Sequence, residues 1–369
     1  MRYHKALLAD IKNSGRVYAQ AKPYIRSIYF GGGTPTLVPA DKLAEVLGTL
    51  RELFSFCTDT EVTVEANPGT LTLDGLSILR RAGANRLSMG VQSLEDRILH
   101  RLGRIHSAED VAESALAARQ AGFDNINFDL IYGLPGQNCA DWKQTLEGIL
   151  DLKPQHLSCY ALSVEEGTPL QRGLEQGVFT LPSEYEICRM ESLIRRKLPA
   201  AGFRHYEISN WSRRGFCCRH NLEYWANGDY IGWGAGAVSY YNRWRFKRQP
   251  NPEKYIDAVN GDGSLYTEAE RLGSAETLRE TVILGLRRRR GINVRALADN
   301  FEEPLRSRLY DVFAGFFAEF PAGLMFFKDG RLRLSGRGRD ISNEIFVRLL
   351  ENKGIEAAFA SSIPHEAYP

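Results

Sequence analysis

A run of small residues, Gly31-Gly32-Gly33-Thr34-Pro35-Thr36, directly follows the apolar segment 25–30. Glycine has no Cβ, so its backbone N–H and C=O groups can approach a ligand closely. In α/β proteins the loop after a parallel strand commonly carries the binding site. The spacing therefore predicts a buried strand, centred on Ile28, whose carboxyl end binds a small polar ligand.

Four further apolar segments centre on Val62, Leu87, Ile126 and Leu157, with an amphipathic stretch in every gap. This alternation predicts parallel strands joined by helices. Polar or glycine residues follow three of these segments: Glu65 to Gly69, Gln92 with Ser93, and Asp129 with Gly133 to Gly136. Each cluster alone is equally well explained as a turn. Because the carboxyl ends of parallel strands meet at one edge of a sheet, together they predict a shared site.

Local signals place the connecting elements. The three-and-four spacing of leucines and a valine over 43–53 predicts a helix beginning near Asp41. Ser107 with Asp110 predicts an acidic capping box, and Gly122 a left-handed helix end. Farther along, the patterns predict helices over 275–286 and 294–301 and a hairpin turning at Asp329-Gly330. The basic run 287–290 is either a solvated helix end or a surface for an acidic partner or nucleic acid.

The composition is that of an ordinary globular protein. The chain has 369 residues, 43% hydrophobic and 25% charged, with a formal net charge of +2. This length suffices for two domains, and the charge does not indicate a nucleic-acid partner. No apolar run reaches the roughly 18 residues of a membrane span. Six irregularly spaced cysteines do not form a secreted disulfide framework, so a reducing cytoplasm is expected.

Several stretches together resemble the radical-SAM family of oxygen-independent coproporphyrinogen III oxidases. They are Phe30–Thr36, Glu65–Gly69, Asn85–Ser93, Leu102–Arg104 and Asn127–Gly136. Two more, Tyr206–Asn210 and His220–Trp225, resemble the HemW branch of haem chaperones; the second has the pattern HNxxYW. The resemblance implies a partial parallel (β/α) barrel of the radical-SAM type.

The resemblance also implies which residues contact S-adenosylmethionine. Gly32, Gly33 and Thr34 line the methionine amine, and Glu65 accepts a hydrogen bond from it. Gln92 and Asp129 hold the ribose hydroxyls. Arg104 pairs with the methionine carboxylate, which suits the planar fork of a guanidinium. The structural alternative is a plain ion pair between Glu65 and Arg104 at the sheet rim.

Members of this family hold a [4Fe-4S] cluster with three cysteines in a CxxxCxxC loop after the first barrel strand. This sequence has no such spacing; its cysteines are Cys57, Cys139, Cys159, Cys188, Cys217 and Cys218. We expect Cys159 in a strand and Cys57 and Cys188 in or beside helices, which offers no substitute cluster site. The resemblance thus implies that the first strand and the cluster ligands are missing here, by natural loss or a misplaced start. An exposed edge strand favours association, so a homodimer is one expectation.

His220 is a candidate axial ligand of haem iron, because neutral imidazole binds that metal. Tyr224 and Trp225 would give the macrocycle apolar cover. On residue type alone, a histidine bonded into an antiparallel sheet is commoner; the family signature favours haem. Cys218 and His220 supply only two of the ligands that a zinc site needs. Val238 stands where the family typically has the histidine of a GAHS-like sequence.

These inferences predict an α/β protein in four segments: a radical-SAM-like partial barrel with an antiparallel extension carrying HNxxYW (1–246), a linker (247–270), a helical, winged-helix-like domain (271–355) and a tail (356–369). The predicted function is a cytoplasmic chaperone that binds haem and delivers it to acceptor proteins, with S-adenosylmethionine as a second ligand. The alternative is an oxygen-independent coproporphyrinogen III oxidase of porphyrin biosynthesis whose cluster segment is missing from this sequence. No catalytic or metal-ligating residue is assigned, so enzymatic activity stays open.

Overall fold

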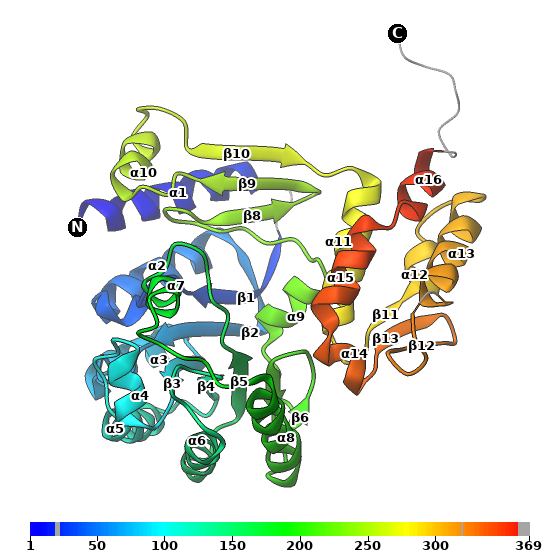
Figure 1. Cartoon of the computed structure of the whole chain (residues 1–369). Coiled ribbons are helices and arrows are strands. Elements are labelled where there is room, and N and C mark those ends of the chain that lie inside the picture. Colours follow the sequence, from blue (N-terminus) through cyan, green and yellow to red (C-terminus); the bar gives the residue numbers. More distant parts are fainter. Residues whose placement is uncertain (19–22, 319, 361–369) are drawn as a thin grey trace. The chain divides into compact units, whose positions relative to one another are not determined.

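The computed structural model describes residues 1–18, 23–318 and 320–360 (Figure 1). The chain divides into two compact units, each discontinuous in sequence. The sheet unit is Ile11–His205 with Ser209–His220, and the composite unit is Met1–Asp10, Tyr206–Ile208 and Asn221–Pro369. Helices α1 (Arg2–Tyr18) and α9 (Arg219–Trp225) each begin in one unit and end in the other.

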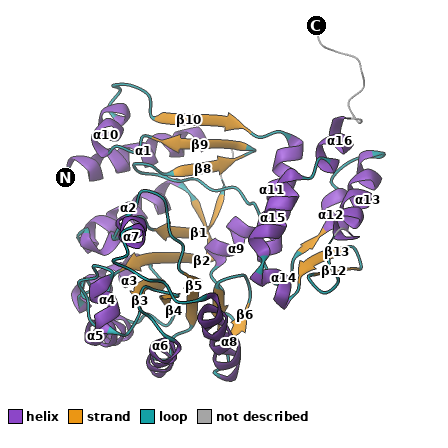
Figure 2. Cartoon of the chain, in the orientation of Figure 1, coloured by secondary structure: helices purple, strands orange, loops and turns teal. Residues whose placement is uncertain are grey.

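The sheet unit is built on seven strands in the order β1-β2-β3-β4-β5-β7-β6. Figure 2 shows strands in orange and helices in purple. The first five are parallel: β1 (Tyr24–Phe30), β2 (Ser55–Ala66), β3 (Arg86–Gln92), β4 (Ile126–Tyr132) and β5 (His156–Ala161). β7 (Asn210–Ser212) and β6 (Arg204–His205) are antiparallel additions. All five strands predicted from the apolar segments are confirmed, and β1 lies at one edge of the sheet.

Helices connect the parallel strands in sequence. They are α2 (Ala40–Leu53), α3 (Leu73–Ala82), α4 (Asp96–Arg101), α5 (Ala108–Gln120) and α6 (Cys139–Asp151), with a short 3-10 turn η1 (Pro35–Leu37) after β1 and α7 (Pro169–Glu175) and α8 (Glu184–Ala200) after β5. The helix expected near Asp41 is α2. Both contacts of the Ser107/Asp110 capping box are present, and Gly122 has φ +87° as expected.

The two faces of this sheet differ in chemistry. Alternate residues such as Val64, Met89 and Phe128 are fully buried in the core with apolar side chains of α2, α3, α5, α6 and α8. The intervening residues are polar and align across the strands, so that Glu65 lies opposite Ser88, Ser88 opposite Asn127, and Asn127 opposite His156. Because side chains alternate along a strand, one face of the sheet is largely polar.

The composite unit contains two three-stranded sheets. β8 (Val238–Tyr241), β9 (Trp244–Arg248) and β10 (Tyr266–Arg271) form one, in the order β10-β9-β8, with α10 (Pro252–Val259) between β9 and β10. β11 (Ile292–Asn293), β12 (Met325–Lys328) and β13 (Arg331–Leu334) form the other, with α11 (Ser274–Arg287), α12 (Val294–Ala298), α13 (Leu305–Ala318), α14 (Gly336–Asp340), α15 (Ser342–Glu351) and α16 (Gly354–Ala360) around it. A separate apolar core, including Val282, Phe313 and Leu332, joins this second sheet to its helices.

Several predictions for this unit can be compared with its elements. The predicted hairpin is confirmed as β12–β13, with Asp329 at φ +54° and Gly330 at φ +71°. The helix predicted over 275–286 is α11, whereas the next one ends at Ala298 rather than at 301. The interval 247–270 carries α10 and β10, so the predicted linker has secondary structure of its own. α16 reaches into the predicted tail, whose residues 361–369 lie outside the described residues.

A buried ion pair holds parts of the composite unit together. Asp10 and Arg248 are each 2% exposed, and Arg248 Nε and Nη2 donate to Asp10 Oδ2 and Oδ1 at 2.7 and 3.0 Å. Tyr255 Oη donates to Asp10 Oδ2 at 2.8 Å. The two parallel hydrogen bonds, together with a third donor, offset the desolvation penalty of burying both charges. The pair therefore attaches the middle of α1 to β9 and α10.

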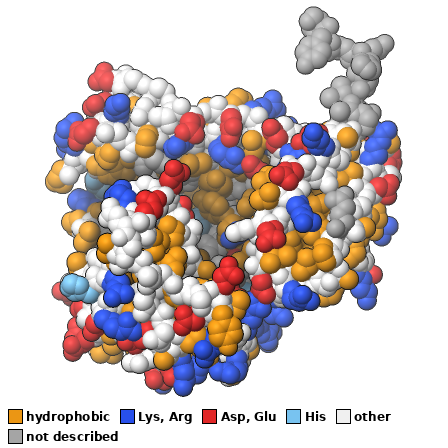
Figure 3. All heavy atoms as spheres, in the orientation of Figure 1, with side chains coloured by type: hydrophobic (Ala, Val, Ile, Leu, Met, Phe, Trp, Pro, Cys, Tyr) orange, Lys and Arg blue, Asp and Glu red, His pale blue; other side chains and the backbone are white. Residues whose placement is uncertain are grey.

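The surface agrees with the near-zero net charge. Acidic and basic side chains are interspersed with hydrophobic ones on the face seen in Figure 3. Among the described residues, no helix is both long and apolar enough to cross a membrane.

Candidate functional site

The glycine turn after β1 leaves its backbone accessible. Gly32 and Gly33 have φ +84° and +69°, a region that side chains disfavour, which explains why glycine stands there. Neither position has another group within 4 Å of where a Cβ would lie. Gly32 N–H donates to Glu65 Oε2 at 3.2 Å. The turn therefore presents exposed amides beside a carboxylate.

Glu65 is the penultimate residue of β2, and both of its carboxylate oxygens accept hydrogen bonds. Oε1 accepts from the hydroxyl of Tyr29 on β1 at 2.8 Å, and Oε2 accepts from Gly32. Burial, then the charges of Glu65 and Asp129, raises the pKa of Tyr29 far above its usual value, so this phenol stays protonated and donates. These two hydrogen bonds thereby hold the half-buried Glu65 carboxylate near the carboxyl end of β2.

Arg104 reaches the same place from the loop after α4. Its Nη2 donates to Asn67 Oδ1 at 2.8 Å and to the Gly90 carbonyl at 2.7 Å, and Asn67 Nδ2 in turn donates to Thr34 Oγ1 at 2.7 Å. Burial lowers the pKa of Arg104 below its usual value. Glu65 and Arg104 thus have different hydrogen-bond partners, an arrangement unlike the simple ion pair considered as an alternative.

Gln92 adopts an uncommon backbone conformation at the end of β3. Its φ is +67°, and the pairing of β3 with β4 shifts between Gly90 and Gln92, as in a β-bulge. A Cβ on Gly90 would lie 3.1–3.2 Å from Asn67 Oδ1, Arg104 Nη2 and Gln92 Nε2. Three polar side chains therefore meet directly above Gly90, and a larger residue at this position would displace them.

Asp129 belongs to a buried polar row on β3, β4 and β5. Its Oδ2 accepts from Ser88 Oγ at 3.0 Å and its Oδ1 from Asn127 Nδ2 at 2.9 Å. Asn127 Oδ1 accepts from His156 Nδ1 at 2.5 Å. Burial holds the pKa of His156 well below its usual value, so the ring is neutral. This row fixes Asp129, which lies opposite Gly90 in the sheet register.

The structure brings the predicted contacts to one place, here called the strand-end corner. Gly32, Gly33 and Thr34 follow β1, and Glu65 and Gln92 lie at the ends of β2 and β3. Asp129 lies within β4, and Arg104 follows α4 with its guanidinium on the Gly90 carbonyl of β3. Asn67, although part of a family motif, carried no predicted role, yet it connects Thr34 to Arg104. What this corner binds remains a prediction.

His220 lies in a second place, here called the His220 corner. Its ring stacks on Tyr29 at 4.8 Å between centroids, and Nδ1 is 3.0 Å from Ser27 Oγ; both partners are on β1. Burial is the largest influence on its pKa, which is lowered to about 4, so the imidazole is neutral at ordinary pH. A neutral ring is the form that binds iron.

The surroundings of His220 correct one expectation. The HNxxYW motif is helical in α9 rather than part of an antiparallel sheet. Tyr224 stacks on Tyr230 at 4.4 Å, and the Arg287 guanidinium lies 4.3 Å from the Trp225 ring centroid, so the basic run is not simply solvated. Val238, at the position where a histidine was expected, begins β8.

The cysteines are all free thiols. Cys159 is in β5 and Cys188 in α8 as predicted, but Cys57 is in β2 rather than in or beside a helix. Cys218 Sγ donates to Glu61 Oε1 at 3.4 Å, and Cys217 Sγ is 3.2 Å from Ser212 Oγ. Within the described residues, no group of three or more His, Cys, Asp or Glu side chains could hold a metal ion.

Comparison with known proteins identifies the family. A model of the radical SAM superfamily matches residues 2–149. Heme chaperone HemW of Bacillus subtilis (strain 168) is 33% identical over 349 residues, which cover 94% of this chain and 91% of that protein. The chain belongs to the HemW family. The HemW of Mycobacterium tuberculosis (strain H37Rv) is 35% identical over 328 residues, covering 89% and 81% of the two chains.

A solved structure supports the fold. Coproporphyrinogen III oxidase (HemN) from Escherichia coli, described as a radical SAM enzyme, superposes with a TM-score of 0.78 over 94% of this chain and 82% of that one. The identity is 23%, so this likeness concerns architecture alone. The sheet unit of this HemW-family chain is accordingly an α/β partial barrel of the radical-SAM type.

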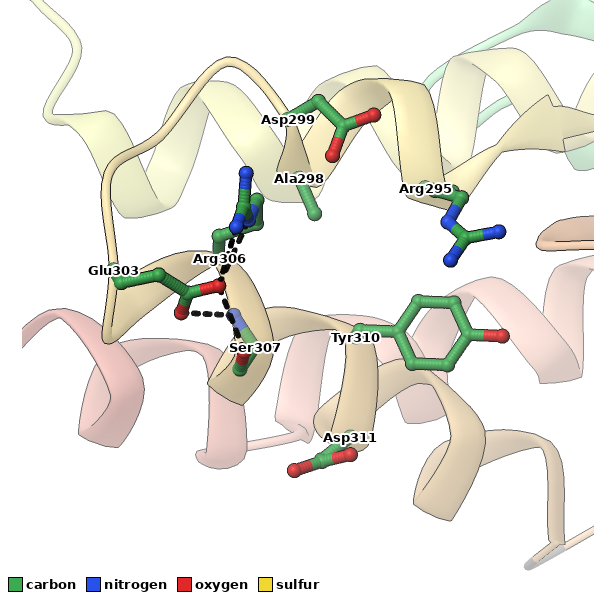
Figure 4. Close-up of a pocket in the computed structure, with 8 residues that line it drawn as sticks. All are labelled: Arg295, Ala298, Asp299, Glu303, Arg306, Ser307, Tyr310 and Asp311. Carbon is green, nitrogen blue, oxygen red and sulfur yellow. Dashed lines mark hydrogen bonds and ion pairs between the residues drawn. The ribbon is translucent and has the colours of Figure 1, made fainter.

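A pocket of about 480 Å³ lies elsewhere, between α12 and α13 of the composite unit (Figure 4). Within it, Glu303 accepts hydrogen bonds from Arg306 Nε at 2.8 Å and from Ser307. The lining consists of Arg295, Ala298, Asp299, Glu303, Arg306, Ser307, Tyr310 and Asp311. None of the predicted site residues is among them.

Proposed function

We propose that this chain binds haem through His220 and delivers it to acceptor proteins. The observation that carries the proposal is the setting of His220 in a chain of the HemW family: a neutral imidazole, stacked on Tyr29 and within hydrogen-bond distance of Ser27. Neutral imidazole is a common axial ligand of haem iron. The proposed carrier function needs binding and release, and no bond in the haem has to change.

We also propose that the strand-end corner binds S-adenosylmethionine. When bound, this molecule presents an ammonium, a carboxylate and two ribose hydroxyls. Glu65 suits the ammonium, beside the exposed backbone of Gly32 and Gly33 and the hydroxyl of Thr34. Arg104 suits the carboxylate because a guanidinium binds it with two parallel hydrogen bonds. Gln92 and Asp129 remain for the two ribose hydroxyls.

The remaining parts of the proposal concern organisation and cell compartment. Residues 271–355 would form a winged-helix-like domain, which the β12–β13 hairpin and the helices sharing its core support. The six free cysteine thiols support a cytoplasmic localisation. Edge strand β1 offers one surface through which a homodimer could form.

Haem titration followed by absorbance tests the carrier function. The parent should bind haem with a histidine-ligand spectrum, and His220→Ala should lose at least tenfold in affinity. His100→Ala, which removes an exposed histidine of α4, is the matched control and should bind like the parent. Equal affinity of parent and His220→Ala would remove His220 from the proposal.

Two further assays separate carrier from enzyme. Haem-loaded protein should transfer its haem to an apo-haemoprotein, seen as the acceptor's own spectrum. The same preparation should leave coproporphyrinogen III unchanged. Decarboxylation of that porphyrinogen would support the oxidase alternative instead.

A further inference from the structure

Glu61 has a set of contacts that neither proposed ligand explains. This carboxylate is on β2, is only 6% exposed, and points to the polar face of the sheet. Its Oε2 accepts from the backbone N–H of Arg219 at 3.0 Å, and its Oε1 from that of His220 at 3.1 Å. Cys218 Sγ donates to the same Oε1 at 3.4 Å. One carboxylate thus accepts hydrogen bonds from three consecutive residues, 218–220, at the start of α9.

These contacts supply what a short helix lacks. The first N–H groups of any helix have no acceptor within it, and the helix dipole favours a negative charge at that end. α9 has only seven residues, and helices of that length do not form in isolation. Arg219 Nη1 also donates to the Asp59 carbonyl at 2.7 Å and pairs with the Asp59 carboxylate. Strand β2 therefore holds the beginning of α9 at two points.

The cap determines where His220 lies. Ser27 is directly opposite Glu61 in the β1–β2 register, and Ser27 is also the partner of His220 Nδ1. Glu61 thus fixes the backbone of His220 while Ser27 and Tyr29 fix its ring. We propose that Glu61 is the positioning residue that sets His220 for haem ligation. This inference rests on the proposed haem function and adds a residue from a distant strand to it.

Two variants of Glu61 test the inference. Glu61→Ala removes both acceptor oxygens, whereas Glu61→Gln keeps one. Hydrogen exchange read by mass spectrometry should show faster exchange over 217–225 in Glu61→Ala, with Glu61→Gln in between. Haem affinity should fall about tenfold in Glu61→Ala, and the electron paramagnetic resonance signal of the ferric haem should change, both with partial rescue in Glu61→Gln.

Thr60→Val is the control for mere loss of stability. Thr60 Oγ1 donates to the carbonyls of Ile25 and Cys57, both at 2.8 Å, and these bonds belong to the sheet rather than to α9. Thr60→Val should leave both the exchange of 217–225 and the haem signal as in the parent. If Glu61→Ala does not fold, Glu61→Gln carries the same comparison.

The outcomes separate this inference from the function on which it rests. Unchanged exchange over 217–225 in both Glu61 variants would overturn it, as would faster exchange with unchanged haem affinity and signal. In either case, a His220→Ala variant that still loses affinity would leave the proposed function standing. If His220→Ala binds haem like the parent, the proposed function and this inference both fail.

Discussion

The strand-end corner and the His220 corner lie on the same sheet but are built in opposite ways. The first is open: its glycines are exposed, and its charged groups have partners both on the strands and in the loops that follow them. The second surrounds one residue: strand β1 contacts the ring of His220, and Glu61 of strand β2 accepts from its backbone N–H. Tyr29 belongs to both, because its ring contacts His220 while its hydroxyl donates to Glu65.

This difference indicates which kind of ligand each corner suits. Exposed amides and a supported carboxylate suit a flexible polar molecule that is recognised atom by atom. A fixed, neutral imidazole suits one strong bond to a metal. The polar row beneath Asp129 supports the first corner through Ser88 and Asn127.

The largest effect should come from that buried row. Asn127→Ala would leave His156, Ser88 and Asp129 without their shared partner, at a cost of about 3 kcal/mol of unfolding free energy. Urea denaturation measures it. Asn138→Ala, which removes the exposed cap of α6, should cost only about 1 kcal/mol. Equal losses of unfolding free energy in the two variants would mean that the buried row stabilises the chain no more than an exposed helix cap does.

Acid should distinguish the His220 corner. The pKa of His220 is about 4 in the folded chain, below the ordinary 6.5, so the unfolded chain binds more protons between these values. Stability should therefore fall as the pH drops from 6.5 to 4, by about 2 kcal/mol more in the parent than in His220→Gln. Parallel curves for the two proteins would contradict the assigned burial of this ring.

A methyl group should disturb the strand-end corner alone. Gly90→Ala places a Cβ 3.1–3.2 Å from Asn67, Arg104 and Gln92, so these side chains must shift. We expect S-adenosylmethionine affinity to fall about fivefold, or roughly 1 kcal/mol, by calorimetry, with haem affinity unchanged. Gly48→Ala, within α2 and with open space around it, is the matched control and should stabilise the chain slightly. An equal loss of haem affinity would show that the corners are not separable.

The smallest effect should come from the shared side chain. Tyr29→Phe removes the bond to Glu65 but keeps a ring to stack on His220. S-adenosylmethionine affinity should fall about threefold, as for one modest hydrogen bond, while haem affinity changes less. A larger loss for haem than for S-adenosylmethionine would reverse the assigned roles of ring and hydroxyl.

The sequence could predict what depends on neighbours along the chain. Strands β1 to β5, the Ser107 cap and the turn at Asp329-Gly330 follow from local periodicity and turn chemistry. The convergence of Glu65 and Asp129 followed from one general property of parallel sheets.

Contacts that depend on register were beyond that reasoning. Asn67 between Thr34 and Arg104, and Glu61 at the start of α9, each join residues that lie far apart in sequence. One signal was present: Glu61, Thr63 and Glu65 alternate with valines, which marks a polar sheet face. The helical state of His220–Trp225 was missed because its cap comes from a strand nearly 160 residues earlier.

The Asp10–Arg248–Tyr255 group bears on how the chain is made. During synthesis Asp10 leaves the ribosome early, whereas Arg248 and Tyr255 follow only after the whole sheet unit has been translated. Asp10 is therefore made well before either of these two partners, and the sheet unit can fold in the interval. Completion of the composite unit is consequently a late event, and a nascent chain stopped before residue 248 would lack the partners that close it.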